Sequence, residues 1–300
     1  MGNWISLTIL ASAFAAAFGQ EAKAQAQTEA QVAPRPWELT LSGGTGLFDT
    51  PAPYLGLALS RQFDNSFVNG RISYSSEAQN AEPNARINLP SRAIGGGLGF
   101  GHRIGNFTGE VHGFYGARRG DPITSEINAP RTNARTAVTT EPQGRSLSFG
   151  GSLSADFGQN LVFTPFVAGD WSSIRTNQVL AIAGRTLGNL VSQTESGVSG
   201  AFGLDVSAPL GPKERFWLGL GASANGATNG AAADFAGSRL QSTGLSQGLN
   251  TAGQDGWGEF SGHASLALTA ASTFTLSGTR SVGVAGGDAT SVGAALSWRF

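Results

Sequence analysis

The chain has 300 residues, with 19 Lys and Arg against 20 Asp and Glu and a formal net charge of −1. A protein that binds nucleic acid needs a clustered excess of basic residues, so this charge balance excludes nucleic acid as a partner. The absence of cysteine excludes disulfides, lipoprotein attachment and thiolate metal sites.

The N-terminal segment has the pattern of a secretory leader. Residues 5–18 form an apolar run of about 14 residues, and Ala22-Lys23-Ala24 matches an A-x-A cleavage site before Gln25. The alternative, a helical anchor, would need roughly 20 apolar residues. We therefore expect a signal peptide over residues 1–24, a short periplasmic segment over 25–36 and one membrane domain over 37–300.

After Phe18 the sequence has no long apolar run, although 40% of its residues are hydrophobic and 44 are glycine. This pattern excludes a helical membrane protein and leaves a closed barrel, which satisfies its backbone hydrogen bonds between strands. The sequence predicts an all-β, transmembrane, antiparallel up-and-down barrel, most simply of twelve strands, with ten or fourteen as alternatives. The twelve alternating segments lie at residues 37–42, 55–59, 68–74, 94–104, 107–115, 147–157, 161–171, 198–206, 216–220, 260–268, 274–276 and 292–300.

The connections between these segments alternate in length. Short turns are expected at residues 64–65, 105–106, 158–160, 211–213 and 271–272, and long polar loops at roughly 77–91, 119–144, 175–195 and 226–256. Bacterial barrels have short periplasmic turns and long extracellular loops. With an even strand count, both termini are then expected in the periplasm of a Gram-negative bacterium, with the barrel in the outer membrane.

Aromatic residues cluster beside the short turns, where a lipid-facing girdle would lie at the membrane interface. The girdle is predicted to contain Phe63, Phe67, Phe107, Phe157, Phe163, Phe216, Phe274, Trp298 and Phe300. Arg61 and Arg145 share the lipid-facing parity at strand ends, where long side chains can reach the interface. Arg280 shares it deeper in a strand, so we expect a bulge or a change of face near Gly278. Arginines of the long loops, Arg118 among them, are expected on the solvated surface.

Strand parity assigns a set of charged and histidine side chains to the barrel lumen. The predicted set is Glu38, Arg71, Arg103, Glu110, His112, Asp156, Asp170, Asp205, Glu259, His263 and Arg299. Two interpretations remain open. The side chains could form ion pairs that fill a narrow barrel, since charges in a low dielectric need partners. They could instead line a water-filled pore whose excess of acids favours cations.

Catalytic chemistry is the competing class of function. Glu110 and His112 lie on one strand face, within reach of each other, but no serine motif accompanies them. The glycine-rich run at residues 95–101 lies inside a strand and lacks the following helix that a nucleotide-binding loop needs. Scattered loop acids lack calcium-loop spacing. We therefore expect a protein that is not an enzyme and has no metal and no cofactor.

The last strand ends in Trp298-Arg299-Phe300, an aromatic-x-Phe pattern. This ending resembles the C-terminal strand that outer-membrane proteins present to the barrel-assembly machinery. The whole segment 37–300 resembles the translocator domain of autotransporters, with no passenger expected in the short segment before it. The resemblance implies that Trp298 and Phe300 act as an assembly signal.

Two functions follow as expectations. The first is a structural, translocator-like barrel or a narrow passive, porin-like pore. The second is surface adhesion or recognition through the long loops at residues 119–144 and 226–256. The expected partners are outer-membrane lipid and lipopolysaccharide, whose phosphates Arg145 could meet, and the barrel-assembly machinery.

Overall fold

A computed structural model describes residues 37–47, 53–77, 91–120, 123–128, 135–182, 185–210, 215–229, 255–283 and 289–300. The predicted leader and the segment 25–36 lie outside these residues. The strands are β1 (Trp37–Leu47), β2 (Tyr54–Phe63), β3 (Ser66–Glu77), β4 (Ser91–Ile104), β5 (Phe107–Gly120), β6 (Ile123–Asn128), β7 (Arg135–Ala155), β8 (Val162–Ile182), β9 (Arg185–Leu210), β10 (Phe216–Ala227), β11 (Asp255–Ala267), β12 (Ser272–Val282) and β13 (Ala289–Arg299). Within the described part of the chain, no helix is long and apolar enough to cross a membrane.

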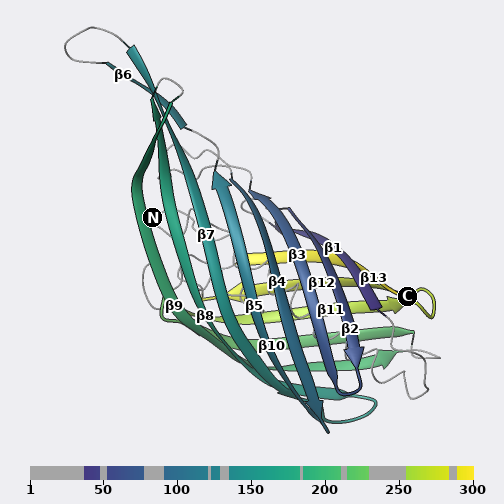
Figure 1. The fold of residues 1–300 in the computed structure, drawn as a ribbon. Coiled ribbons are helices and arrows are strands. Elements are labelled where there is room, and N and C mark those ends of the chain that lie inside the picture. The colour runs from purple at the N-terminus through teal and green to yellow at the C-terminus, as the bar shows by residue number, and fades with distance from the viewer. Residues whose placement is uncertain are drawn as a thin grey trace.

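All pairings between neighbouring strands are antiparallel, and the sheet closes into a ring (Figure 1). The closing seam joins β1 to β13, from Glu38 opposite Arg299 to Leu47 opposite Thr290. The main chains of Trp37 and Phe300 exchange two hydrogen bonds of 3.0 Å at its end. Strand β5 pairs with β7, which leaves β6 outside the ring. The predicted twelve-stranded barrel is therefore confirmed, and its first and last strand ends meet at one rim.

That rim also carries the predicted short connections that lie among the described residues, whereas residues 211–213 lie outside them. Turns occur at Asp64-Asn65 and Gly105-Asn106, and the positive φ values of Asp64 (38°) and Gly105 (60°) fit such tight reversals. We call this end the short-turn rim and the opposite end the long-loop rim. A barrel with an even number of strands places both chain ends at the same rim, as observed here.

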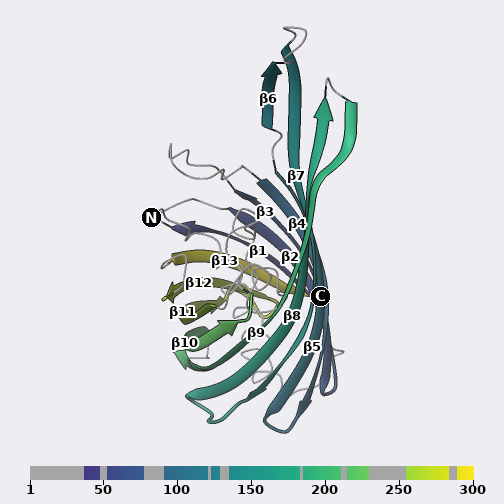
Figure 2. The ribbon, with the colours of Figure 1, turned by 90° about the vertical axis from the view of Figure 1, so that its left-hand side faces the viewer.

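The long-loop rim differs from prediction on one side. Residues 135–144, 175–182 and 185–195, expected in polar loops, belong to β7, β8 and β9. Together with β6 they continue past the other strands as a projection (Figure 2). The sequence indicated loops because these stretches are rich in polar residues and lack a sustained period-two alternation, which a strand beyond the membrane does not need. Most of the predicted loops 77–91 and 226–256 lies outside the described residues.

The two faces of the barrel wall invert the pattern of a soluble protein. The large apolar side chains are exposed on the outer face, for example Leu98 at 75% and Leu220 at 70%, while small residues such as Ser148 and Ser281 are fully buried. Lipid is as apolar as leucine, so a membrane barrel presents its apolar side chains outward and alternates them with inward polar ones. This alternation fixes which side chains face the lumen.

Three expectations about individual residues were wrong. Phe67 faces inward, because its ring covers the inner side of Gly101. Arg280 remains on the outer face beside Phe260, and the register through Gly278 is continuous, so neither a bulge nor a change of face occurs there. An arginine near a strand end can extend its charge to the interface. Arg118 is 5% exposed and faces the lumen rather than the solvent.

Barrel interior as candidate functional site

The predicted lumen residues lie on strand faces opposite the exposed apolar side chains. At the short-turn rim they form two ion pairs. Arg299 Nε lies 3.3 Å from Glu38 Oε2 across the β1–β13 seam. Arg103 Nη2 lies 3.4 Å from Asp156 Oδ2, and Thr164 Oγ1 donates to the other oxygen of Asp156 at 2.7 Å. These pairs neutralise four of the predicted lumen charges.

A central polar cluster, made of Asn69, Arg71, Glu110, His112 and Asp170, spans β3 to β8. The Nε2–H of His112 donates to Oδ1 of Asp170 at 2.6 Å, and the two side chains are 5% and 0% exposed. Glu110 Oε1 accepts a hydrogen bond of 3.5 Å from Asn69 Nδ2. The structure thus joins His112 to Asp170, while Glu110, the neighbour expected from sequence, hydrogen-bonds Asn69.

Arg71 supplies the positive charge of this cluster. Its guanidinium lies over the ring of Phe114, with Cζ 5.4 Å from the ring centroid. The charges of Glu110 and Asp170 act on it. Asp170 Oδ2 and His112 Nδ1 are buried without a hydrogen-bond partner. The cluster is therefore compact, and only some of its hydrogen-bonding groups have partners. In such a buried network, removal of one member is expected to lower the stability of the barrel strongly.

Glycines on alternate strands explain how these side chains meet. The register forms one inner row, Asn69–Gly99–His112–Gly150–Asp170. A Cβ at Gly99 would overlap Asn69, and one at Gly150 would overlap Oδ1 of Asp170. Gly150 therefore lets Asp170 lie across the wall and reach His112, and Gly99 leaves room for Asn69, which hydrogen-bonds Glu110.

The wall formed by β9 to β11 carries a different set. Asp205 is 7% exposed and lies across Gly221, toward Ser261. His263 lies across Gly219 in the same manner. Glu259 faces the lumen from β11 with Ser223 and Ser281 beside it. The inward residues described on these three strands include no Lys or Arg.

Two inward charges were missed by sequence reasoning, Arg118 and Glu195. Arg118 shares the parity of Glu110 and His112, so extending the fifth predicted strand by three residues would have found it. Glu195 accepts a hydrogen bond of 2.6 Å from Gln193 Nε2 and lies in a stretch that was expected to be a loop. Because the two charges have opposite signs, the excess of acids over bases in the lumen set is unchanged.

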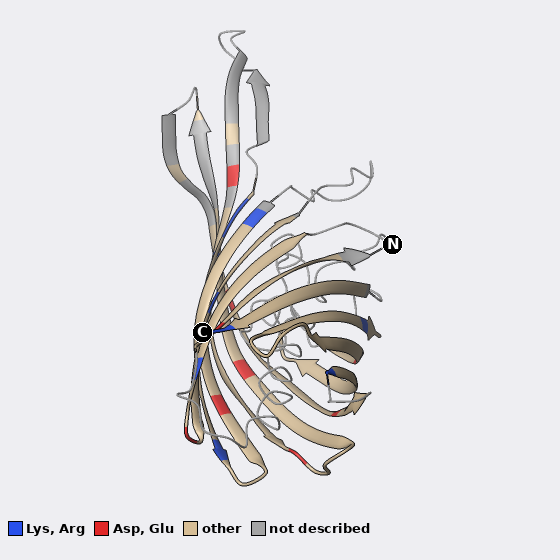
Figure 3. Cartoon of the chain, turned by 90° about the vertical axis from the view of Figure 1, so that its right-hand side faces the viewer, with Lys and Arg blue, Asp and Glu red and all other residues tan. Residues whose placement is uncertain are grey.

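The chemistry of the described interior is that of a polar lining. It combines small hydroxyl side chains, ion pairs and one buried His–Asp pair. Among the described residues, no group of three or more His, Asp or Glu is placed to hold a metal ion. Figure 3 shows how few charged segments interrupt the barrel strands.

Comparison with solved structures bears on the fold. The translocator domain of the autotransporter NalP from Neisseria meningitidis is similar over 98% of this chain and 99% of its own, with 15% identity and a TM-score of 0.57. The β domain of the Bordetella autotransporter BrkA covers 89% of this chain and 99% of its own, with 13% identity and a TM-score of 0.54. An outer-membrane channel from Pseudomonas putida F1 is similar over 91% of this chain and 97% of its own, with 9% identity and a TM-score of 0.50.

The fold is that of an outer-membrane β-barrel. The resemblance to autotransporter translocator domains, expected from the last strand and the strand count, is confirmed at the level of fold. No family model matches the chain, and no curated protein matches it in sequence.

Proposed function

We propose that the protein is a narrow, passive outer-membrane pore that favours small cations, with its short-turn rim in the periplasm. The observation that carries this proposal is a closed ring of strands whose outer face is apolar and whose inner face is lined by serine, threonine, glycine and charged side chains. A polar lining around an enclosed lumen is typical of diffusion pores in this class of barrel.

The distribution of charge supports the cation preference. On β3 to β8 the inward arginines are balanced by Glu110, Asp156 and Asp170, whereas the inward side chains described on the β9–β11 wall are the acids Glu195, Asp205 and Glu259 and include no Lys or Arg. A lumen with an acid excess raises the local concentration of cations and lowers that of anions. The preference is weak because most of the charges are paired.

Planar bilayers with purified protein test the proposal. Small conductance steps should appear, and the reversal potential in a KCl gradient should show K⁺ passing more readily than Cl⁻. Membranes that remain silent at micromolar protein would contradict a pore and leave a structural, translocator-like barrel. A preference for Cl⁻ would contradict the role given to the acidic wall.

Surface recognition is a second candidate function, and the projection formed by β6 to β9 favours it. Strand β6 pairs with residues Arg135 to Thr140 of β7, and β7 pairs with β8 from Val138 opposite Ile182 to Ser154 opposite Phe166. Projecting strands give loops a fixed position outside the membrane. Removal of residues 123–140 should abolish adhesion to host or abiotic surfaces while heat-modifiable folding persists. Unchanged adhesion would refute this candidate.

A further inference from the structure

Four arginines lie side by side on the outer face of adjacent strands, close to the long-loop rim. We call this set the arginine belt: Arg92 on β4, Arg119 on β5, Arg145 on β7 and Arg175 on β8. Arg92 is directly opposite Arg119, and Arg145 is directly opposite Arg175. All four side chains are exposed. Figure 3 shows basic segments at this end of the barrel wall.

Like charges that face each other across a strand pair repel, so the belt needs a compensating anion. Glu141 supplies one compensating negative charge, because both of its carboxylate oxygens accept hydrogen bonds from Arg119, one of them at 3.0 Å. It is the only acidic side chain described on the outer face of β4 to β8. Arg175 Nε donates to Ser192 Oγ at 3.4 Å, a neutral partner. Among the described residues no other acid pairs with the belt, so we assign its three remaining positive charges to an external anion.

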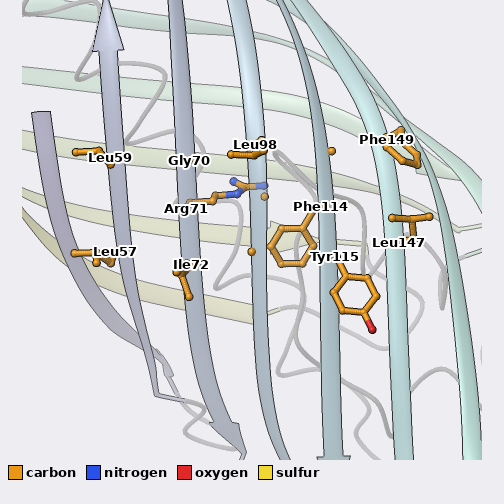
Figure 4. Close-up of a pocket in the computed structure, with 13 residues that line it drawn as sticks. Leu57, Leu59, Gly70, Arg71, Ile72, Leu98, Phe114, Tyr115, Leu147 and Phe149 are labelled. Carbon is orange, nitrogen blue, oxygen red and sulfur yellow. The ribbon is translucent and has the colours of Figure 1, made fainter. Parts of the chain in front are cut away.

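An apolar groove, drawn in Figure 4, lies on the same outer face, on the short-turn side of the belt. Its volume is about 710 Å³. Leu57 and Leu59 line one side, Leu98 stands in the middle, and Leu147 and Phe149 line the other side. Its floor contains Gly70, Gly96 and Gly113, whose missing side chains create the depression.

The register connects the groove to the belt. Leu147 is the first outward residue after Arg145 on β7 in the direction away from the long-loop rim, and it faces Tyr115 on β5. Two residues along a strand correspond to about 7 Å. A molecule with an anionic head and an apolar chain can therefore touch the belt and the groove at once.

We propose that this surface binds lipopolysaccharide, with lipid phosphates on the arginine belt and an acyl chain in the groove. Arginine suits this role because its planar guanidinium binds phosphate oxygens through two parallel hydrogen bonds. The assignment to lipopolysaccharide rests on the proposed orientation, in which the long-loop rim faces the cell exterior. The phosphate-binding residues of the site lie on the outer face, whereas the groove is also bordered by Arg71 and Phe114 of the inner face.

Binding of labelled lipid A to detergent-solubilised full-length protein tests the site. The double variant Arg145→Ser/Arg175→Ser should bind about ten-fold more weakly, which corresponds to about 1.4 kcal/mol. Arg280→Ser is the matched control, because it removes an outward arginine on the opposite wall, and its affinity should be unchanged. Equal affinity of the double variant and the wild type would overturn the proposal, as would an equal loss with Arg280→Ser.

Two further binding experiments separate the contribution of the lipid phosphates from that of the acyl chain. Lipid A without its phosphates should bind the wild type as weakly as the double variant binds the phosphorylated lipid, and equal binding of both lipids to the wild type would overturn the phosphate contact. Gly96→Leu should weaken lipid binding by filling the groove, because a Cβ there lies 3.3 Å from the carbonyl oxygen of Arg71 and 3.9 Å from Cγ1 of Ile72, with nothing else among its nearest neighbours within 4 Å. Unaltered binding by a folded Gly96→Leu variant would overturn the acyl contact.

Competition by inorganic phosphate and the bilayer conductance of the double variant are two further controls. Displacement of the lipid by millimolar inorganic phosphate would mean a site for free anions and would overturn the proposal. Conductance in planar bilayers should be the same for the double variant and the wild type. Lipid binding in detergent depends on neither conductance nor orientation, so silent bilayers would refute the pore and leave the result on lipid binding standing.

Discussion

The buried pair of His112 and Asp170 offers a sharp test of the interior. Asp170→Ala removes a carboxylate with no exposed side-chain surface and leaves the Nε2–H of His112 without its acceptor at 2.6 Å. It also removes one of the two anionic charges that act on Arg71. The change deletes atoms without adding any, so steric strain does not contribute.

The expected loss follows from this burial. Removing the acceptor leaves the Nε2–H of His112 buried and unsatisfied, which costs about 1–3 kcal/mol and more where the hydrogen bond involves a charged group. His112→Ala should cost less than Asp170→Ala, since Asp170 also serves Arg71. The double variant should be less destabilised than the sum of the single ones, with a coupling energy of about 1 kcal/mol or more.

Urea-induced unfolding in phospholipid vesicles, followed by tryptophan fluorescence, measures these free energies. The same double-mutant cycle at Arg119 and Glu141 is the control. The Arg119 side chain is 72% exposed, so that pair should show a smaller coupling energy. Additive effects of His112→Ala and Asp170→Ala would refute the reasoning, and so would a larger coupling at the exposed pair.

Three other predictions use the lumen, the seam and the C-terminus. Neutralising Asp205 and Glu259 as Asn and Gln should lower the K⁺ over Cl⁻ preference in bilayers, and an unchanged reversal potential would count against the acidic wall. Gly44→Ala should destabilise the barrel by about 1–3 kcal/mol, because its Cβ would overlap the carbonyl oxygen of Val292 across the seam and lie 2.9 Å from Cα of Gly293. Gly109→Ala, with nothing within 4 Å of the new Cβ, should change urea unfolding little, and equal effects would refute the steric account. Deleting Phe300 removes two backbone hydrogen bonds at the seam, each worth about 0.5–1.5 kcal/mol, and should reduce the yield of heat-modifiable barrel in outer-membrane fractions; wild-type yield would refute an assembly role.

The alternation of side chains could be predicted from sequence with good accuracy because a strand has a period of two. Leu98 and Phe100 alternate with glycines, and Glu110 and His112 alternate with apolar residues. The alternation within each strand therefore indicates which side chains face the lumen and which face the lipid. Phe67 was misplaced because it was judged by its distance from a turn. Its parity, shared with Asn69 and Arg71, gives the correct face.

Strand ends were harder to predict than strand faces. Arg118 continues the inward parity of β5, but the sequence beyond Tyr115 is polar and was interpreted as loop. The same reasoning missed the extension of β7, β8 and β9 past the membrane. Outside the bilayer a strand no longer needs apolar residues, so the signal that identifies it within the bilayer disappears there.

The sequence by itself determined the class of fold and the inward or outward direction of most side chains, and it favoured twelve strands over ten or fourteen, because these depend on local periodicity and on turn positions. Only the tertiary structure decided which side chains meet. His112 and Asp170 are 58 positions apart and pair because the β5–β7–β8 register aligns them across Gly150. Arg145 and Arg175 become neighbours through the same registers, 30 positions apart in sequence. Register is set by closure of the whole ring, so no single segment of the chain contains it.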